Sequence, residues 1–282
     1  MEAIKLSNGV QMPRIGYGTW RIPDEEVTQL VLTAAQVGYR HFDTAARYNN
    51  ERGVGRAIQE IMDRGIASRN ELFVTTKVWN DSRGYDKAMA AFDRSMQALG
   101  LDVLDLCLIH WPAAPHQFEN WKELNNGTWK ALETVYREGR VRSIGVSNFK
   151  IHHLQPLLEN AQIQPMINQI EIHPGLPQLE CIEFCQSRGI VVEAWSPLGT
   201  GRMVVNEELA QIAQRYQCTT AQLCLRYLTQ KNVVPLPKSF NEGRMKQNLM
   251  LPAFDLSDHD MALIDAMPYF GGSGEDPDKI SF

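Results

Sequence analysis

Val103-Leu104-Asp105-Leu106-Cys107-Leu108-Ile109 is a nearly continuous apolar run that ends directly before His110. A run of this kind is typical of a parallel strand that is covered on both faces. Downstream, Thr128–Arg137 has apolar residues at helical spacing. The segment therefore predicts one strand followed by one helix.

The same alternation recurs along the chain. Other strand-like runs occur at Tyr39–Phe42, Leu72–Thr76, Val141–Val146, Pro165–Gln169, Ile190–Ala194 and Val233–Leu236. Amphipathic stretches lie between them, and Thr219–Leu228 and Ser257–Met267 exceed one helix per strand. With a weak first strand included, the pattern predicts eight β/α units with two extra helices. Asn8-Gly9, between two short alternating runs, predicts an N-terminal β-hairpin.

A parallel sheet of this size either closes into a barrel or stays open as a doubly wound sheet. An open dinucleotide-binding sheet is expected to show Gly-x-Gly-x-x-Gly after its first strand. Here Gly16-Tyr17-Gly18 has no glycine at the third position, and the phosphate-binding loop that ends in Gly-Lys-Ser/Thr is missing. We therefore expect an α/β fold of the (β/α)8 TIM-barrel type. No linker-like segment interrupts the sequence, so residues 1–282 are expected to form a single domain.

The composition of the chain argues against several classes of protein, including nucleic-acid-binding and membrane proteins. A net charge of −5 over 282 residues argues against nucleic acid or an anionic membrane as the partner, because both favour a strongly basic face. The N-terminus lacks the pattern of a secretory signal, and no apolar run reaches the length of a membrane helix. Five scattered cysteines are typical of a reducing compartment. These features predict a cytoplasmic protein, and the helical spacing of Cys181 and Cys185 favours packing over metal binding.

In a TIM barrel the active site lies at the carboxyl ends of the strands. Polar residues at the ends of the predicted strands are therefore candidates for the site. In chain order they are Asp43-Thr44, Lys77, His110, Ser147-Asn148, Gln169, Trp195-Ser196 and Lys238-Ser239.

Four residues in this region suggest acid catalysis by a phenol. A tyrosine has an ordinary pKa near 10, and an ammonium group such as Lys77 is expected to lower the pKa of Tyr48. Asp43 would keep Lys77 charged, and His110 could donate a hydrogen bond to a substrate carbonyl oxygen. A structural Asp43–Lys77 ion pair and a core histidine are the ordinary alternatives.

Hydrolytic and metal-dependent chemistry have little support. The sequence has no Gly-x-Ser-x-Gly elbow and no cysteine beside a suitable base. His110 is followed by Trp-Pro, and His152-His153 begins a predicted helix. This spacing does not match a cluster of metal ligands at strand ends, so no metal is expected.

Three stretches resemble the aldo-keto reductase family, in order along the chain. They are Gly38-Tyr39-Arg40-His41-Phe42-Asp43-Thr44-Ala45 with Tyr48, Glu51 and Gly55, then Ile144-Gly145-Val146-Ser147-Asn148-Phe149, and finally Leu236-Pro237-Lys238-Ser239 with Arg244. The chain is most similar to the microbial branch that includes diketogluconate and methylglyoxal reductases and prostaglandin F synthases.

This resemblance implies NADPH-dependent reduction of aldehydes or ketones, with Tyr48 as general acid and Asp43, Lys77 and His110 completing a tetrad. It implies that NADPH binds across the barrel mouth. The matching cofactor positions are Ser147, Asn148, Gln169, Trp195, Ser196, Leu198, Gly199, Lys238, Ser239, Arg244, Gln247 and Asn248. Gln247 stands where many members carry glutamate.

For the substrate, the resemblance points to Trp20, Trp79, His110 and Trp111, with Phe118 as a weaker candidate. These aromatic residues suggest an apolar slot without a fixed charge for an anionic substrate, and small α-dicarbonyls and aromatic aldehydes are the expected substrates. The alternative from another class is a nicotinamide-binding partner protein with little turnover, similar to the potassium-channel β subunits. We expect a monomer, although the sequence leaves a dimer open.

Overall fold

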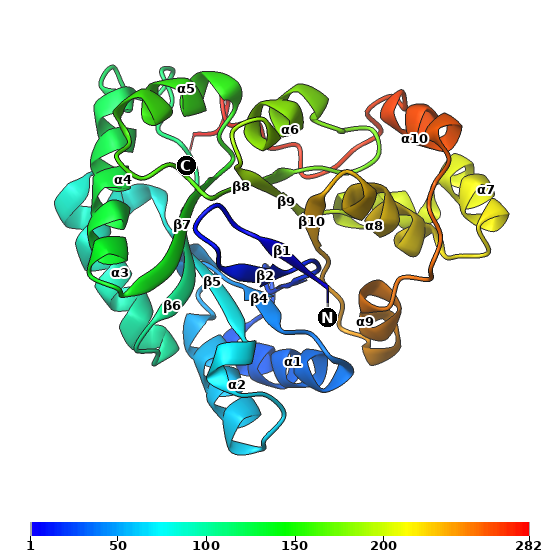
Figure 1. The fold of residues 1–282 in the computed structure, drawn as a ribbon, viewed down its shortest axis with the longest axis horizontal. Coiled ribbons are helices and arrows are strands. Elements are labelled where there is room, and N and C mark those ends of the chain that lie inside the picture. The colour runs from blue at the N-terminus through cyan, green and yellow to red at the C-terminus, as the bar shows by residue number, and fades with distance from the viewer. Residues whose placement is uncertain (1, 282) are drawn as a thin grey trace.

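The computed structural model describes residues 2–281. Within this range eight parallel strands form one sheet, in which each strand pairs with the next along the chain (Figure 1). The strands are β3 (Tyr17–Gly18), β4 (His41–Asp43), β5 (Phe73–Val78), β6 (Leu104–Ile109), β7 (Val141–Ser147), β8 (Ile167–Glu171), β9 (Val191–Trp195) and β10 (Val233–Leu236).

Backbone hydrogen bonds between β3 and β10 close this sheet into a barrel. The amide of Gly16 donates to the carbonyl of Pro235 at 3.0 Å, and that of Gly18 donates to Pro237 at 3.2 Å. A Cβ atom on Gly16 would lie 2.5 Å from the side chain of Leu236, so a larger residue would force the seam apart. The predicted TIM barrel is confirmed, and these glycines serve its closure.

Helices surround the barrel (Figure 1). They are α1 (Asp24–Val37), α2 (Glu51–Asp63), α3 (Tyr85–Leu99), α4 (Trp121–Arg137), α5 (Ile151–Asn160), α6 (Leu179–Gln186), α7 (Glu207–Arg215), α8 (Thr220–Gln230), α9 (Glu242–Leu249) and α10 (Asp258–Asp265). The apolar spacing did not predict α9, because only Met245 and Asn248 of this short helix are buried. Its detectable signal is Asn241, whose side chain accepts from the amide of Arg244 as an N-cap.

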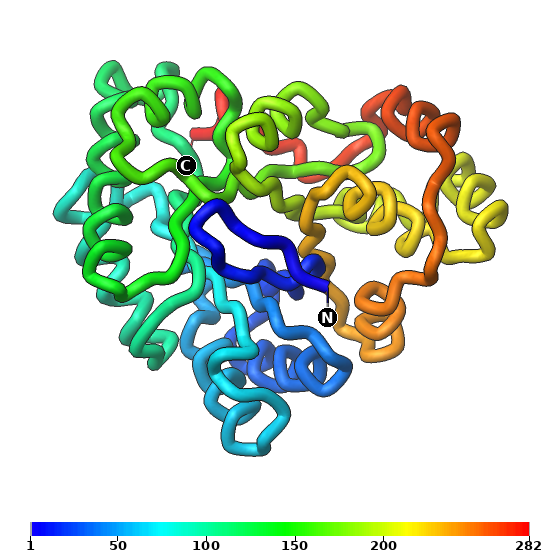
Figure 2. The backbone as a smooth tube through the Cα atoms, in the orientation of Figure 1, coloured from blue at the N-terminus to red at the C-terminus, as the bar shows by residue number. Residues whose placement is uncertain are grey.

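The N-terminal hairpin predicted around Asn8-Gly9 is confirmed. Strands β1 (Ala3–Lys5) and β2 (Gln11–Pro13) pair antiparallel. The hairpin crosses the end of the barrel that faces the viewer in Figure 2. Asn8 donates from its amide to the carbonyl of Arg142, beside the first residue of β7. The hairpin therefore covers the amino ends of the strands and leaves the carboxyl ends to the site.

Several strands continue further than the apolar runs indicated. Asp43, Ser147 and Trp195 are the last residues of β4, β7 and β9, and Lys77 is the penultimate residue of β5. Their backbones are therefore held by the sheet rather than by loops. This placement gives their side chains fixed directions into the carboxyl end of the barrel.

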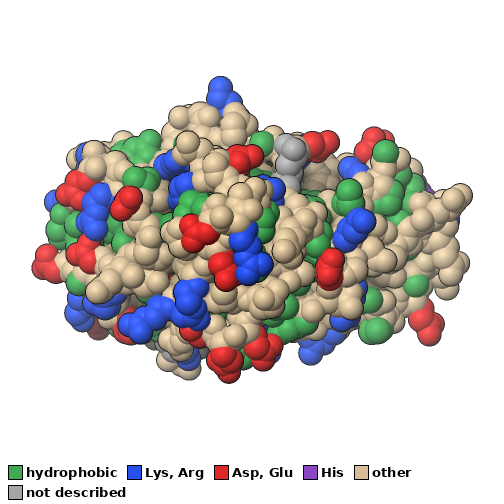
Figure 3. Space-filling model, turned by 90° about the horizontal axis from the view of Figure 1, so that it is seen from below, with side chains coloured by type: hydrophobic (Ala, Val, Ile, Leu, Met, Phe, Trp, Pro, Cys, Tyr) green, Lys and Arg blue, Asp and Glu red, His purple; other side chains and the backbone are tan. Residues whose placement is uncertain are grey.

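The surface seen in Figure 3 carries interspersed acidic and basic side chains. Such mixing is typical of an ordinary solvated protein face. None of the helices within residues 2–281 combines the length and the apolar character needed to span a bilayer.

Candidate active site

Lys77 lies at the centre of the candidate catalytic residues. Its Nζ donates to both carboxylate oxygens of Asp43, at 2.7 and 2.8 Å, and to the carbonyl of Thr44 at 3.0 Å. The same nitrogen lies 3.2 Å from the phenol oxygen of Tyr48. The structure thus brings the predicted acid, ammonium and carboxylate together, although they come from separate segments of the chain.

The electrostatics of Tyr48 differ from the simple expectation. Burial raises the pKa of Tyr48 above its ordinary value, and the charge of Lys77 opposes this effect without overcoming it. Lys77 thus acts in the predicted direction, but the net pKa of Tyr48 lies above its ordinary value because burial outweighs it. Burial alone would lower the pKa of Lys77, but Asp43 and Tyr48 raise it above its usual range. The site therefore holds a protonated phenol beside a stable ammonium group.

His110 lies next to Tyr48 and Trp79. The His110 ring centroid is 5.6 Å from that of Tyr48 and 5.0 Å from that of Trp79. Burial, followed by the charges of Lys77 and Arg47, lowers the pKa of His110 well below its usual value. His110 is therefore neutral near pH 7, and a neutral imidazole retains one N–H that can donate to a carbonyl oxygen.

Three polar residues form a second group at the adjoining strand ends. Ser147 donates from its hydroxyl to the carbonyl of Gln169 at 2.8 Å. Asn148 donates from its amide to the carbonyl of His110 at 2.9 Å and to Ser147 Oγ at 3.1 Å. Gln169 donates to Asp43 Oδ2 and to Glu193 Oε2, both at 2.9 Å. Since their protons are engaged within the protein, these side chains offer oxygen atoms as acceptors.

The loop after β9 continues this group. The indole of Trp195 donates to Asn148 Oδ1 at 2.8 Å, and its ring centroid lies 6.4 Å from that of Trp111. Ser196 and Gly199 have positive φ angles of 52°, and Ser196 Oγ accepts from the amide of Thr200. Leu198 is half-buried in the same loop. The tight turn keeps this backbone beside Trp195.

Cationic residues gather at the end of β10 and on α9. Lys238 donates to the carbonyl of Trp20 at 2.9 Å, and burial and the charge of Arg21 lower the pKa of Lys238. Ser239 is buried. Arg244, Gln247 and Asn248 share one face of α9, since they are three or four residues apart. A cationic rim at one end and amide and hydroxyl oxygens at the other fit a phosphorylated dinucleotide with a carboxamide.

The aromatic candidates for the substrate pocket differ in exposure. Trp20 is 37% exposed, Trp79 is half-buried and Trp111 is buried. Phe118 is half-buried, with the Arg83 guanidinium 5.2 Å from its ring.

A fixed positive charge lies beside one of these aromatic residues. The guanidinium of Arg47 lies 5.3 Å from the centre of the Trp79 ring. This residue was overlooked although it immediately precedes Tyr48.

Two further buried residues were also overlooked. Glu193 and His41 are fully buried within the barrel, with His41 Nε2 at 3.5 Å from Glu193 Oε1. Burial, followed by the charge of Asp43, raises the pKa of Glu193 to about 8. A glutamate inside the apolar run of β9 was the available sequence signal. It contacts the site through Gln169.

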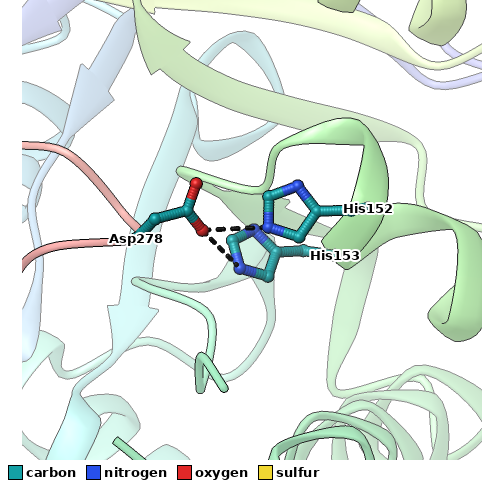
Figure 4. A group of neighbouring side chains, drawn as sticks. All are labelled: His152, His153 and Asp278. Atoms are coloured by element: carbon teal, nitrogen blue, oxygen red, sulfur yellow. Dashed lines mark hydrogen bonds and ion pairs between the residues drawn. The ribbon is translucent and has the colours of Figure 1, made fainter. Parts of the chain in front are cut away.

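His152, His153 and Asp278 form a separate cluster that joins α5 to the C-terminal segment (Figure 4). Asp278 Oδ1 lies 2.9 Å from His152 Nε2 and 3.3 Å from His153 Nε2. His153 Nδ1 accepts from the amide of Lys150, so the neutral ring carries its proton on Nε2. That nitrogen therefore has no lone pair free for a metal. Lys150 adds an ion pair to Asp278 at 2.7 Å, so this cluster anchors the C-terminal segment.

Comparison with known proteins identifies the family. The profile described as "Aldo/keto reductase family" matches residues 14–268. The chain belongs to this family. It is 46% identical to the glyoxal reductase of Bacillus subtilis over 282 residues, covering 100% of this chain and 98% of the relative. It is 44% identical to the 9,11-endoperoxide prostaglandin H2 reductase of Trypanosoma cruzi, covering 99% of this chain and 96% of that protein.

Solved structures agree with this assignment. An aldo-keto reductase of Bombyx mori, in complex with NADP, superposes with a TM-score of 0.86 at 35% identity, covering 96% of this chain and 99% of that chain. The protein is accordingly an NADPH-dependent oxidoreductase that reduces aldehydes or ketones. The similarity to named reductases does not favour the alternative of a nicotinamide-binding partner with little turnover.

Proposed function

We propose that Tyr48 donates the proton during carbonyl reduction by this aldo-keto reductase. The observation that carries this proposal is the position of Lys77 Nζ, in contact with both the Asp43 carboxylate and the Tyr48 phenol. As the substrate oxygen gains negative charge, the phenol proton moves to it. Lys77 then stabilises the phenolate, and Asp43 holds Lys77 in its charged form.

Neutral His110 orients the carbonyl in this proposal. Its remaining N–H donates to the carbonyl oxygen on the side of the Tyr48 phenol. The hydrogen bond strengthens as charge develops on that oxygen, so it contributes mainly to the transition state. A protonated His110 beside Lys77 would be disfavoured by repulsion between like charges.

The residues between β7 and α9 would hold NADPH, which supplies the hydride when bound. The oxygens of Ser147, Asn148 and Gln169 would accept from the carboxamide, and Trp195 would pack on the nicotinamide ring. The turn containing Ser196, Leu198 and Gly199 would hold the pyrophosphate. The adenosine 2′-phosphate would lie between Lys238, Ser239 and Arg244, with Gln247 and Asn248 near the adenine.

The proposed substrates are small carbonyl compounds, including α-dicarbonyls and aromatic aldehydes. Trp20, Trp79 and Trp111 supply aromatic surface beside His110, which suits flat or apolar groups. The similarity to a protein named glyoxal reductase supports the α-dicarbonyl class.

We further propose that the chain acts in the cytoplasm as a monomer with one domain. The five cysteines form no disulfide within residues 2–281, as is typical of reducing compartments. One continuous hydrophobic cluster extends from Leu6 to Met267, which supports a single folding unit. Light scattering of the purified protein at several concentrations tests the monomer.

The principal test is Tyr48→Phe. Loss of the phenol proton is expected to lower kcat at least about 100-fold for methylglyoxal. Binding of NADPH, followed by the change in cofactor fluorescence, should stay near the wild-type value. Wild-type turnover in the variant across the pH range would contradict the role of Tyr48. Tyr85→Phe, an exposed tyrosine on α3, is the matched control.

Arg244→Ala tests the cofactor site. If its guanidinium binds the 2′-phosphate, the variant should bind NADPH at least about tenfold more weakly, since a charge-assisted hydrogen bond contributes roughly 1.5–3 kcal/mol. NADH lacks that phosphate, so its affinity should change much less. Equal weakening of both cofactors in a fluorescence titration would remove Arg244 from the phosphate site.

A further inference from the structure

Arg47 places a positive charge at the edge of the candidate active site. It belongs to the short 3-10 helix Ala46–Tyr48, directly before the proposed proton donor. Its side chain is exposed, with the guanidinium 5.3 Å from the centre of the Trp79 ring. The His110 ring also contacts Trp79, with the two ring centroids 5.0 Å apart. The guanidinium and the imidazole that would orient the carbonyl therefore share Trp79 as a neighbour.

The positive charge of Arg47 affects a residue of the candidate active site, although the Arg47 side chain is exposed to solvent. It is one of the causes that lower the pKa of His110, after burial and Lys77. An arginine on an aromatic face keeps its planar donors available at the edge while the ring limits its movement. Arg47 is thus oriented beside the reacting region.

Arg47 also differs from the nearby Arg56 in its ion pairing. None of the ion pairs within residues 2–281 involves Arg47. Arg56, on the adjacent helix α2, forms an ion pair with Asp24 at 2.7 Å. A guanidinium held against an aromatic ring but not neutralised by the protein is suited to an anionic ligand group.

Space for such a group is present. Arg47 and Trp79 are among the residues that line a groove of about 1150 Å³ between α2 and α3. Exposed Arg52 and Arg94 line the same groove. Its lining includes two acidic residues, Glu51 and Asp81, against the four arginines Arg47, Arg52, Arg56 and Arg94. The side chains that line the groove therefore carry more positive than negative charges.

We propose that Arg47 gives this enzyme a preference for carbonyl substrates that carry a carboxylate about one ring or a few methylenes away from the carbonyl. The inference rests on the proposed function, because the carbonyl must bind at Tyr48 and His110. With the carbonyl there, the substrate spans Trp79, and its carboxylate meets the edge of the Arg47 guanidinium. Substrate selection then depends on charge as well as on the aromatic surface.

Two aldehydes of the same skeleton test this proposal: 4-carboxybenzaldehyde and its methyl ester, methyl 4-formylbenzoate. The measured quantity is the ratio of kcat/KM for the acid to kcat/KM for the ester, with saturating NADPH. Arg47→Gln is expected to lower this ratio at least about tenfold, chiefly through KM of the acid, because a charge-assisted hydrogen bond is lost. Arg47→Lys, which keeps the charge but loses the planar fork, should retain part of the ratio.

Arg56→Gln is the matched control, since it removes an arginine of the same groove that Asp24 already neutralises. It should keep the wild-type ratio. Raising NaCl from 50 to 300 mM should raise KM of the acid in the wild type and have much less effect in Arg47→Gln.

The outcomes separate this inference from the proposed function. If the wild type reduces neither aldehyde although it binds NADPH, the proposed function itself fails for this substrate class, and the inference fails with it. If the wild type reduces the ester and Arg47→Gln changes both substrates equally or neither of them, only the inference is overturned. A ratio that falls in Arg47→Gln and not in Arg56→Gln supports it.

Discussion

Two acid–base pairs are buried in the barrel, and they differ in ionisation. Lys77 and Asp43 lie 2.7 Å apart, and Lys77 also contacts Thr44 and Tyr48. His41 and Glu193 lie 3.5 Å apart, and His41 Nδ1 and Glu193 Oε1 have no hydrogen-bond partner within residues 2–281. The first pair is held as an ammonium and a carboxylate, whereas burial lowers the pKa of His41 to about 3 and raises that of Glu193 to about 8.

This comparison shows that burial by itself does not decide the charge state. Lys77, His41 and Glu193 are all nearly inaccessible to solvent. A buried ion stays charged only where close partners and additional hydrogen bonds compensate its desolvation. Gln169 joins the two pairs, since its amide donates to both Asp43 and Glu193. Because Glu193 is neutral, it does not repel the negative charge of the Asp43 carboxylate.

Lys77→Met breaks the charged pair and is expected to have the largest effect. It leaves the Asp43 carboxylate buried without its cation, which typically costs about 3–5 kcal/mol of unfolding free energy. Urea unfolding at pH 7 measures this loss, and kcat should fall as well because the Tyr48 phenolate loses its stabilising charge. Lys87→Met, an exposed lysine of α3, is the control. A loss below about 1 kcal/mol would show that the ion pair is not required.

Glu193→Gln tests the neutral pair. Between the unfolded pKa near 4.5 and the folded pKa of about 8, the unfolded chain has lost the proton that the folded protein keeps. This glutamate therefore contributes stability at low pH that is lost as the pH rises to 8, at roughly 1.4 kcal/mol per pH unit. The unfolding free energy of Glu193→Gln, relative to the wild type, should increase by about 2–3 kcal/mol from pH 6 to 8 and stay constant above it. Parallel stability curves for the two proteins would contradict a protonated Glu193.

His41→Gln gives the smallest expected effect and tests the same pair from the acid side. The pKa of folded His41 is about 3, below the 6.5 of an unperturbed histidine. Between these values the unfolded chain binds a proton that the folded protein does not, so wild-type stability falls as the pH drops below 6.5. From pH 6.5 to 5 the wild type should lose about 1–2 kcal/mol more than His41→Gln in urea unfolding. An equal loss in both proteins would indicate that His41 is charged in the folded state.

The sequence by itself determined the barrel fold and predicted which strand ends carry the candidate catalytic residues. Apolar runs and helical spacing are local patterns, so the β/α alternation could be predicted, together with Asp43, Lys77 and His110 at strand ends. The closing seam at Gly16 could not, because it depends on hydrogen bonds to the last strand, and apolar spacing missed α9 because few of its residues are buried.

Only the tertiary structure decided the electrostatics. Whether Tyr48 has a raised or lowered pKa depends on the sum of its burial and the charges of Lys77 and Asp43, which the sequence does not measure. The neutral state of Glu193, the engaged protons of Gln169 and the position of Arg47 on Trp79 likewise arise from residues distant along the chain. Desolvation and Coulomb energies depend on distances in space, and these are set when the strands assemble into the barrel.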